Sequence, residues 1–200
     1  MTNGIWAILI AYVLGAIPFG YLLVKFTSGA DVRASGSGNI GATNVLRTAG
    51  KAAGAATLAL DIGKGLLAVW LAGWLTNGSA GAMSLAALAV MGGHAFPAFL
   101  NFKGGKAVAS FAGAFLYLTP VPLLAVAVVF VVMVALTRYI SAGSIVAAGT
   151  FPLAVWMILH PPSMVLLASL AAGAFIVNRH RSNIQRLREG TENQFRWDKL

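Results

Sequence analysis

The segment GSGNIGATNVLR, from Gly36 to Arg47, combines residue types that bind anions. Its glycines let the backbone approach a ligand closely, and successive exposed amides form a concavity that attracts negative charge. Arg47 adds a planar guanidinium that can hold two phosphate oxygens. We therefore interpret the segment as a phosphate-binding loop, in which Arg47 acts directly on substrate. The other candidate substrate-binding residues of the loop are Ser37, Gly38, Asn39, Thr43 and Asn44.

Two other interpretations of this segment can be weighed. A glycine-rich turn followed by one cytoplasmic arginine would be purely structural, but it leaves the concentration of small polar side chains unexplained. The spacing of Gly36, Gly38 and Gly41 also fits the dinucleotide fingerprint G-x-G-x-x-G, with Asp61 as the ribose-binding acid. That fingerprint needs a preceding strand and a βαβ unit. Here the segment joins two long apolar runs, so a dinucleotide site is excluded.

A second polar cluster lies in GHAFPAFLNFKGGKAVA, residues 93–109. Gly104 and Gly105 predict a flexible turn, and Lys103 and Lys106 place a cation on each flank, which suits an anionic ligand. Anchoring of the two lysines to lipid headgroups is the structural alternative. All four residues are candidates for substrate binding, with Lys106 acting directly in the reaction.

Three ionisable residues lie within or beside apolar runs. Asp61 and Lys64 are three residues apart, so they can neutralise each other on one helix face. A structural ion pair is favoured, although charged groups in membrane spans mark functional sites by default, which leaves a wall of the active site as the alternative. For His94, a hydrogen-bonded packing role is favoured over a catalytic one.

A third cluster is NRHRSNIQRLREGTEN, residues 178–193. His180 and Asn183 would share a face on a helix continuing from the preceding apolar run, where they can orient a substrate hydroxyl or phosphate. Glu192 and Asn193 are further substrate-binding candidates. The arginines of this segment favour binding to anionic lipid headgroups; they are Arg179, Arg181, Arg186 and Arg188.

Two serines follow Arg138 and are expected at the same membrane level as these clusters. Ser144 is a candidate for substrate binding, and Ser141 lies one helical turn before it. A helix N-cap is the structural alternative for either serine.

Composition indicates an integral membrane protein. Hydrophobic residues make up 58% of the 200 residues and charged residues 10%, against roughly 45–50% and about 25% in soluble domains. The net charge of +9 is located between or after apolar runs, which argues against nucleic-acid binding. The absence of cysteine excludes disulfides and thiolate chemistry. The N-terminus MTNG carries no basic residue before the first apolar run, so we expect a membrane span there and no cleaved signal peptide.

Apolar runs of near-spanning length predict an all-α fold with about seven transmembrane helices. The runs cover residues 5–24, 54–75, 80–100, 107–119, 121–137, 141–159 and 162–178. The fourth is short. Thr119, Pro120 and Pro122 separate it from the fifth, because proline interrupts a helix interior.

The distribution of Lys and Arg predicts the orientation, because cytoplasmic loops collect these residues. Seven spans place all basic loops on one side, with the N-terminus outside and the C-terminus cytoplasmic. We expect one polytopic domain over residues 1–200, with a cytoplasmic tail at 179–200. The three clusters then emerge at the cytoplasmic face, where one interfacial pocket collects Arg47, Lys106, His180 and Asn183 around phosphate groups and an acyl chain.

Several common catalytic signatures are absent. No histidine begins the motif H-x-x-x-x-D, which is the signature of thioester-dependent glycerolipid acyltransferases. The motif G-x-S-x-G, the P-loop motif and H-E-x-x-H are also missing. No cluster of acids and histidines suggests a metal, and no cofactor is expected.

Taken together, the three clusters resemble the cytoplasmic motifs of the bacterial acyl-phosphate-dependent glycerol-3-phosphate acyltransferases, the PlsY family. The resemblance covers almost the whole chain, in the same motif order. It implies acyl transfer from acyl phosphate to the 1-hydroxyl of glycerol 3-phosphate, giving lysophosphatidate and phosphate in the first step of phospholipid synthesis. It also implies a bacterial inner-membrane location and a soluble acyl-phosphate synthase as partner. The residues implied to bind the two phosphates are Ser37, Arg47, Lys106, His180 and Asn183, with Ser144 nearby.

The resemblance leaves the general base open between His180 and a phosphate oxygen of the acceptor. Two other classes of function compete with an enzyme. A transporter for an organic phosphate would carry ligand groups near mid-membrane and inverted repeats, whereas the polar groups here gather toward one face. A non-catalytic lipid-binding scaffold would show neither turnover nor transport.

Overall fold

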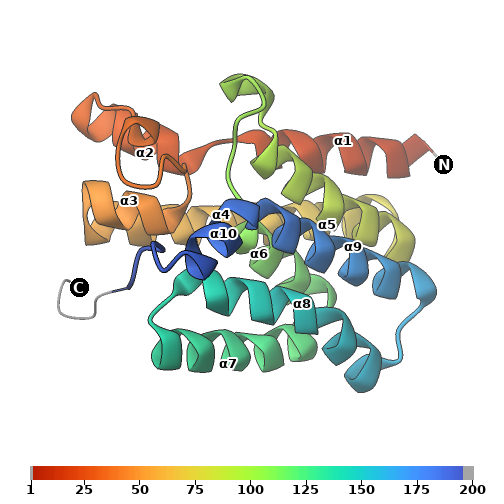
Figure 1. Cartoon of the computed structure of the whole chain (residues 1–200). Helices are drawn as coiled ribbons and strands as arrows, with labels where there is room; N and C mark the ends of the chain where they lie inside the picture. Colours follow the sequence, from red (N-terminus) through yellow and green to blue (C-terminus); the bar gives the residue numbers. More distant parts are fainter. Residues whose placement is uncertain (1, 196–200) are drawn as a thin grey trace. The chain divides into compact units, whose positions relative to one another are not determined.

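A computed structural model of the chain describes residues 2–195 (Figure 1), and every regular element in that range is helical. Helices suit so apolar a chain, because a helix satisfies its own backbone hydrogen bonds within lipid. The chain divides into two compact units, Met1–Leu118 and Thr119–Leu200, which are described separately below.

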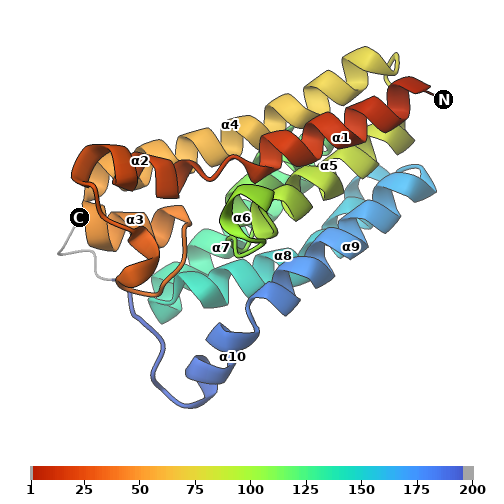
Figure 2. The same ribbon diagram turned by 90° about the horizontal axis from the view of Figure 1, so that it is seen from above.

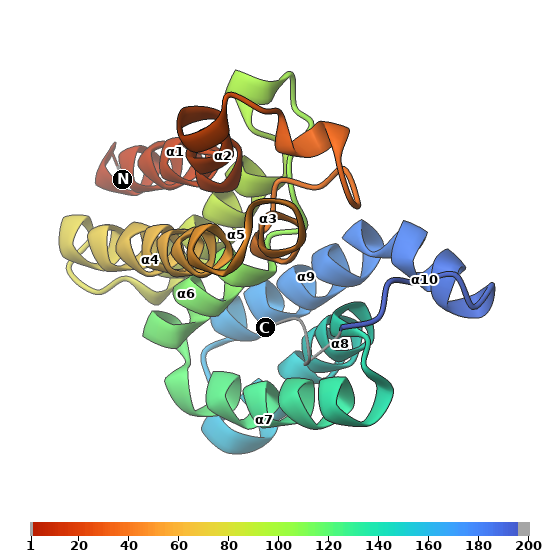
Figure 3. The same ribbon diagram turned by 90° about the vertical axis from the view of Figure 1, so that its left-hand side faces the viewer.

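The first unit contains six α-helices and two 3-10 turns. In chain order they are α1 (Thr2–Ala16), α2 (Phe19–Ser28), η1 (Val32–Ala34), α3 (Ala42–Ala49), α4 (Lys51–Leu75), α5 (Ala80–Ala95), η2 (Ala98–Leu100) and α6 (Val108–Leu118). The helices α1, α4 and α5 pack against one another, and α6 packs on α4 and α5 (Figure 2). Seen nearly end-on in Figure 3, α3 lies beside the first half of α4.

Small residues allow the close approach of these helices. A Cβ on Gly15 of α1 would overlap the backbone at Val90 of α5, and a Cβ on Gly93 would overlap the backbone of α1. Gly65 of α4 and Gly113 of α6 meet the partner backbone in the same way. Glycine contacts of this kind are typical of helix packing in membranes, where apolar burial against lipid provides no driving force.

The first predicted span, 5–24, is interrupted in the structure. Helix α1 ends at Ala16 and α2 begins at Phe19, with Pro18 between them. The proline has no N–H to continue the backbone ladder of α1. The two helices together still form one apolar segment, Asn3–Ser28, that is long enough to cross a membrane.

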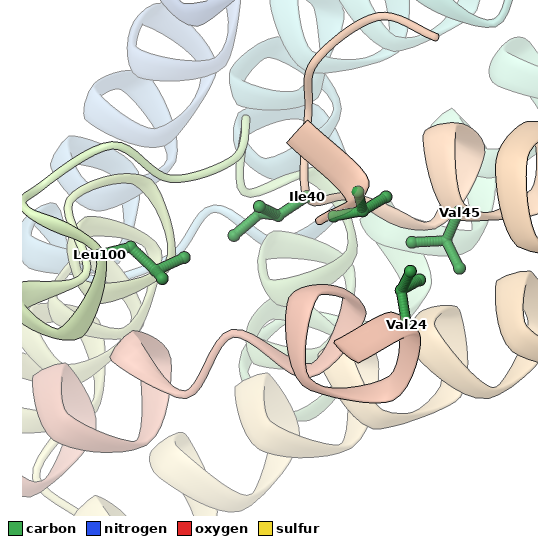
Figure 4. Packing of buried hydrophobic residues seen from close by; sticks show 5 residues of the cluster. Val24, Ile40, Val45 and Leu100 are labelled. Carbon is green, nitrogen blue, oxygen red and sulfur yellow. The ribbon is translucent and has the colours of Figure 1, made fainter. Parts of the chain in front are cut away.

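A small apolar cluster holds the segment that follows α2. Val24 of α2, Ile40 and Val45 lie together with Leu100 of η2 (Figure 4), and Val32 completes the cluster. All five side chains are at most 8% exposed. The glycine-rich segment is therefore anchored at both ends to the helices of its own unit.

Over residues 119–195, the second unit has four helices. They are α7 (Pro120–Thr137), α8 (Ile140–Leu159), α9 (Ser163–Arg179) and α10 (Arg181–Arg188). Helix α8 packs against both α7 and α9. Pro120 occupies the first turn of α7, where a missing N–H costs no hydrogen bond. The predicted break between the fourth and fifth apolar runs is therefore found at this proline.

Five helical segments of the described chain are long and apolar enough to cross a membrane, and the bent pair α9–α10 makes a sixth. The all-helical membrane fold is therefore confirmed. Helix α6, which corresponds to the short fourth run, has 11 residues; at 1.5 Å per residue it covers only about 16 Å of a hydrocarbon core of about 30 Å. The count of seven spans and the orientation stay predictions. The predicted tail, 179–200, includes residues 196–200, which lie outside the described range.

Candidate active site

The segment of the first unit that is predicted to bind phosphate is partly helical. The sequence predicts a loop over residues 36–47, but the second half of this segment forms α3, which begins after Gly41 and carries Arg47 in its last turn. Gly36 and Gly38 have φ angles of 62° and 70°, in the left-handed region that glycine adopts without strain. The side chains of Ser37 and Arg47 are exposed, as a substrate-binding role requires.

Asn44 forms the centre of this segment. Its side-chain Nδ2 donates to the carbonyls of Val32, Ser35 and Asn39 at 2.9–3.1 Å, and its Oδ1 accepts the backbone N–H of Ser37 at 2.8 Å. The side chain is 2% exposed. Its bonds are made to the backbone of residues 32–39, so Asn44 holds the shape of the loop that precedes α3. Asn39 also acts locally, because its Oδ1 accepts the N–H of Gly41 at 2.8 Å. Thr43 is half-buried on the first turn of α3.

The lysine-flanked turn folds back onto the end of α5. The backbone N–H of Gly104 donates to the carbonyl of Ala95, and that of Gly105 donates to the carbonyl of His94, each at 3.1 Å. The two glycines are required for space: a Cβ on Gly104 would overlap the backbone of α5, and a Cβ on Gly105 would overlap the ring of His94. The predicted turn is therefore a packed structure and not a flexible one. Lys103 is exposed and Lys106 half-buried.

The predicted pairing of Asp61 with Lys64 is confirmed. Lys64 Nζ lies 2.8 Å from Asp61 Oδ1 and donates to the carbonyl of Ile17 at 2.9 Å. His94 joins the pair, with Nδ1 at 3.6 Å from the same Asp61 oxygen. All three ionisable side chains are at most 5% exposed. Sequence spacing gave no signal for the contact between Asp61 and His94.

The third cluster is built around a bend in the second unit. Helices α9 and α10 meet at His180 with an angle of 53°, so the continuous helix expected through His180 and Asn183 is wrong. His180 Nδ1 lies 2.8 Å from the carbonyl oxygen of Ile176. A carbonyl can only accept, so Nδ1 carries the proton, and Nε2 is the basic atom of the neutral ring.

Glu192 gathers three donors in this unit. Its Oε1 accepts from Asn183 Nδ2 at 2.7 Å and from Ser141 Oγ at 2.9 Å, and its Oε2 accepts from Arg186 Nε at 2.7 Å. Burial of the Glu192 carboxyl opposes its ionisation, but these three hydrogen bonds outweigh burial and lower its pKa below the usual value. Arg186, assigned to lipid headgroups in the sequence analysis, is thus an internal partner of Glu192.

Neither serine of α8 is an N-cap. The cap position is Tyr139, which makes no side-chain capping bond. Ser141 bonds to Glu192, and Ser144 donates back to the carbonyl of Ile140 at 2.9 Å within the helix. Asn193, on the segment after α10, is exposed.

The structure therefore brings the predicted residues together in groups within each unit. Ser37 and Asn39 lie in the loop before α3 and are bonded to Asn44 of α3, the helix that carries Arg47. Asn183 lies in one hydrogen-bonded group with Glu192. Convergence of the groups on one pocket stays a prediction. Across residues 2–195, no three His, Asp or Glu side chains are placed to hold a metal ion.

Comparison with known proteins gives the family. The family model "Glycerol-3-phosphate acyltransferase" matches residues 5–190. The glycerol-3-phosphate acyltransferase of Desulforamulus reducens is 49% identical over 91% of this chain and 90% of its own, and that of Geobacter sulfurreducens is 46% identical over 98% and 100%.

Solved structures agree with the sequence relatives. PlsY (YgiH), an integral membrane glycerol 3-phosphate acyltransferase, is 36% identical in its glycerol 3-phosphate form, with a TM-score of 0.91 over 96% of each chain. Its lysophosphatidic acid form is 34% identical, with a TM-score of 0.89 over 98% of this chain and 97% of that one. The chain therefore belongs to the glycerol-3-phosphate acyltransferase family and is a multi-pass membrane acyltransferase.

Proposed function

We propose that this protein transfers a fatty acyl group from acyl phosphate to the 1-hydroxyl of glycerol 3-phosphate. The products are 1-acyl-glycerol 3-phosphate and inorganic phosphate, and the reaction is the first step of phospholipid synthesis. The observation that carries the proposal is the full-length match to PlsY, which is solved in glycerol 3-phosphate and lysophosphatidic acid forms. The acyl-phosphate donor is inferred from the three motifs and from the absence of the H-x-x-x-x-D signature of thioester-dependent enzymes.

The chemistry needs no covalent enzyme intermediate. Acyl phosphate is a mixed anhydride, so the 1-hydroxyl oxygen can attack its carbonyl carbon while the bond to the phosphate oxygen breaks. Phosphate leaves with the bonding electrons, and the hydroxyl proton passes to a base. The protein's contribution is then to position two anionic substrates and stabilise the developing charge. The base is Nε2 of His180 or a phosphate oxygen of the acceptor.

Each motif has a role in this scheme. Arg47 and Lys106 offset the repulsion between the two substrate phosphates, and Asn183 orients the acceptor beside His180. The remaining contacts to the phosphates come from hydroxyls, backbone amides and flanking polar groups; these residues are Ser37, Gly38, Asn39, Thr43, Lys103, Gly104, Gly105, Ser144 and Asn193. Asn44 and Glu192 act one step further away, by holding the loop and the Asn183 amide.

The donor is tested by turnover of the purified protein in detergent. Acyl phosphate, acyl-CoA and acyl carrier protein of one chain length are compared as donors, with lysophosphatidate and phosphate measured separately. We expect lysophosphatidate and phosphate in equal amounts from acyl phosphate alone. Equal or faster turnover with a thioester donor would contradict the proposal. Analysis of the product isomer tests the 1-hydroxyl as acceptor.

We further propose a bacterial inner-membrane location, with the C-terminus and all three motifs cytoplasmic and a soluble acyl-phosphate synthase supplying the donor. The chain contains no cysteine, so single cysteines report without background. With an impermeant thiol reagent applied to intact cells, we expect Ser79→Cys and Ser163→Cys to react, and Ala49→Cys and Ser182→Cys to react only after permeabilisation. Labelling of Ala49→Cys and Ser182→Cys on opposite faces would exclude a common site.

A further inference from the structure

We propose that the buried cluster of Asp61, Lys64 and His94 positions Lys106, by fixing the His94 ring beneath the turn formed by Gly104 and Gly105. The inference rests on the proposed function in one respect, the direct role of Lys106 with substrate phosphate. It assigns to His94 a positioning role, in which the ring acts through the backbone of the turn and not on substrate.

An ion pair between Asp61 and Lys64 orients the cluster. Lys64 Nζ is fixed from two sides, by Asp61 at 2.8 Å and by the carbonyl of Ile17 at 2.9 Å. Ile17 lies at the break between α1 and α2. A lysine held in this way keeps the Asp61 carboxylate charged and in one orientation, because leaving either charge unpaired at a buried site is costly.

The ring of His94 lies between Asp61 and the turn. Its Nδ1 faces Asp61 Oδ1 at 3.6 Å. Its Nε2 lies against Gly105, where a Cβ would overlap it. The residue is 4% exposed. The ring thus fills the space between the carboxylate on α4 and the turn, which leaves no room at Nε2 for a substrate group and argues against His94 as an acid or base.

The backbone is held in place on each side of Lys106. On one side, the turn is bonded to the carbonyls of Ala95 and His94 through Gly104 and Gly105. On the other, Ala107 is fully buried with a φ of 62°. A residue other than glycine keeps a left-handed conformation only where its surroundings enforce it. Lys106 therefore projects from a backbone that is fixed at both neighbours.

The test is a mutational cycle built on the difference between the two glycines. The three atoms nearest to a Cβ on Gly105 all belong to the ring of His94, whereas a Cβ on Gly104 meets the backbone of α5 and the ring of Pro97. His94→Ala should therefore relieve Gly105→Ala and leave Gly104→Ala unrelieved. The variants are the three single substitutions and the doubles His94→Ala/Gly105→Ala and His94→Ala/Gly104→Ala.

Two readouts are measured on purified, folded protein. The first is kcat/KM for glycerol 3-phosphate. The second is the rate at which an amine-reactive reagent modifies Lys106 relative to the exposed Lys103, read by mass spectrometry without substrates. The second readout reports the position of Lys106 and does not depend on which donor the enzyme uses. Failure of wild-type turnover with acyl phosphate would thus count against the proposed function alone.

We expect Gly105→Ala to lower kcat/KM by about tenfold or more in the wild-type background and by less than about threefold in the His94→Ala background, with the labelling ratio following the same pattern. Gly104→Ala should cost the same factor in both backgrounds. The proposal would be overturned if Gly105→Ala lowered kcat/KM by the same factor in both backgrounds. It would also be overturned if the labelling ratio of Lys106 to Lys103 were unchanged in Gly105→Ala. If His94→Ala does not fold, His94→Gln, whose flexible amide can turn away from a Cβ at residue 105, replaces it in the same cycle.

Discussion

The side-chain amide of Asn183 donates a 2.7 Å hydrogen bond to Oε1 of Glu192, the same oxygen that accepts from Ser141. An amide fixed in this way presents its remaining hydrogen-bonding groups in one orientation, which suits a residue proposed to orient substrate. Glu192 is 6% exposed and also accepts from Arg186. The carboxylate therefore links the segment after α10 to α8 and α10 within the second unit.

Glu192→Gln should destabilise this unit. The amide cannot accept three hydrogen bonds as the carboxylate does, and it turns an N–H₂ toward a donor, which typically costs about 1–3 kcal/mol of unfolding free energy. Thermal unfolding in detergent measures the change. Glu189→Gln is the matched control, because Glu189 is exposed and bonds only Gln185 among the hydrogen bonds described for it. An equal shift in both variants would contradict the role given to Glu192.

The same carboxylate predicts a pH dependence. Its pKa is lowered in the folded protein, so the stability it contributes is complete above the unfolded value, near 4.5, and is lost as pH falls through the folded value. The difference in unfolding temperature between wild type and Glu192→Gln should therefore be constant above about pH 6 and shrink below about pH 4. A difference that grows on acidification would contradict this assignment.

Asn44→Asp should disorder the glycine-rich loop. The aspartate keeps an oxygen for the Ser37 N–H but loses the donors to Val32, Ser35 and Asn39, and it sets a carboxylate against three carbonyl oxygens. Hydrogen exchange of the backbone amides of residues 32–45 should become faster. Asn39→Asp is the matched control, because an aspartate at that position can still accept the N–H of Gly41. Unchanged exchange in Asn44→Asp would contradict a structural role for the side chain.

Much of the fold could be predicted because apolar runs in a membrane protein have little choice but to form helices. The runs 121–137 and 141–159 differ by one residue at their start from α7 and α8. Local details that depend on a few polar residues were harder to predict from the sequence. Helix α3 carries Thr, Asn and Arg in eight residues, and so lacks the apolar signal that revealed the others.

The site was predicted in its parts but not in its supporting contacts. Motif residues stand out because charged residues are only 10% of the chain, and in the motifs they stand beside amides and clustered glycines. Contacts such as Asp61 with His94, or Glu192 with Ser141, join residues that are distant in sequence and follow no spacing rule. The bend at His180 was missed for a related reason: nothing in the residues 178–183 interrupts a helical pattern, and the bend is set by tertiary structure.

Arg47→Ala and Lys106→Ala should each lower turnover by about 100-fold or more, because each removes a cation that we propose stabilises the charge developing on a substrate phosphate in the transition state. Both proteins should still fold, since Arg47 is exposed and Lys106 half-buried. Turnover with acyl phosphate and the unfolding temperature are measured together. Lys51→Ala is the control, as an exposed cation on the neighbouring helix α4. Near-normal turnover of a folded Arg47→Ala or Lys106→Ala would remove the phosphate-binding assignment.

His180→Gln distinguishes the two candidate bases. If Nε2 of His180 takes the hydroxyl proton, turnover should fall by about 100-fold, and the acidic limb of the pH–rate profile should disappear. A loss smaller than about tenfold, with the acidic limb retained, would favour proton transfer to the substrate phosphate. His160→Asn is the control for a general effect of removing a histidine, since His160 is exposed at the end of α8.

The ion pair between Asp61 and Lys64 should show strong coupling in a double-mutant cycle. Asp61→Asn and Lys64→Met each leave one buried charge without its partner, at a cost of about 3–5 kcal/mol in unfolding free energy. The double variant removes both charges, so its cost should be well below the sum of the two. The half-exposed pair Asp31 and Arg33, 2.7 Å apart, is the control, because solvent screens its charges and its cycle should be closer to additive. Additive losses at Asp61 and Lys64 as well would mean that neither charge depends on the other, and the cluster could not orient His94 as proposed.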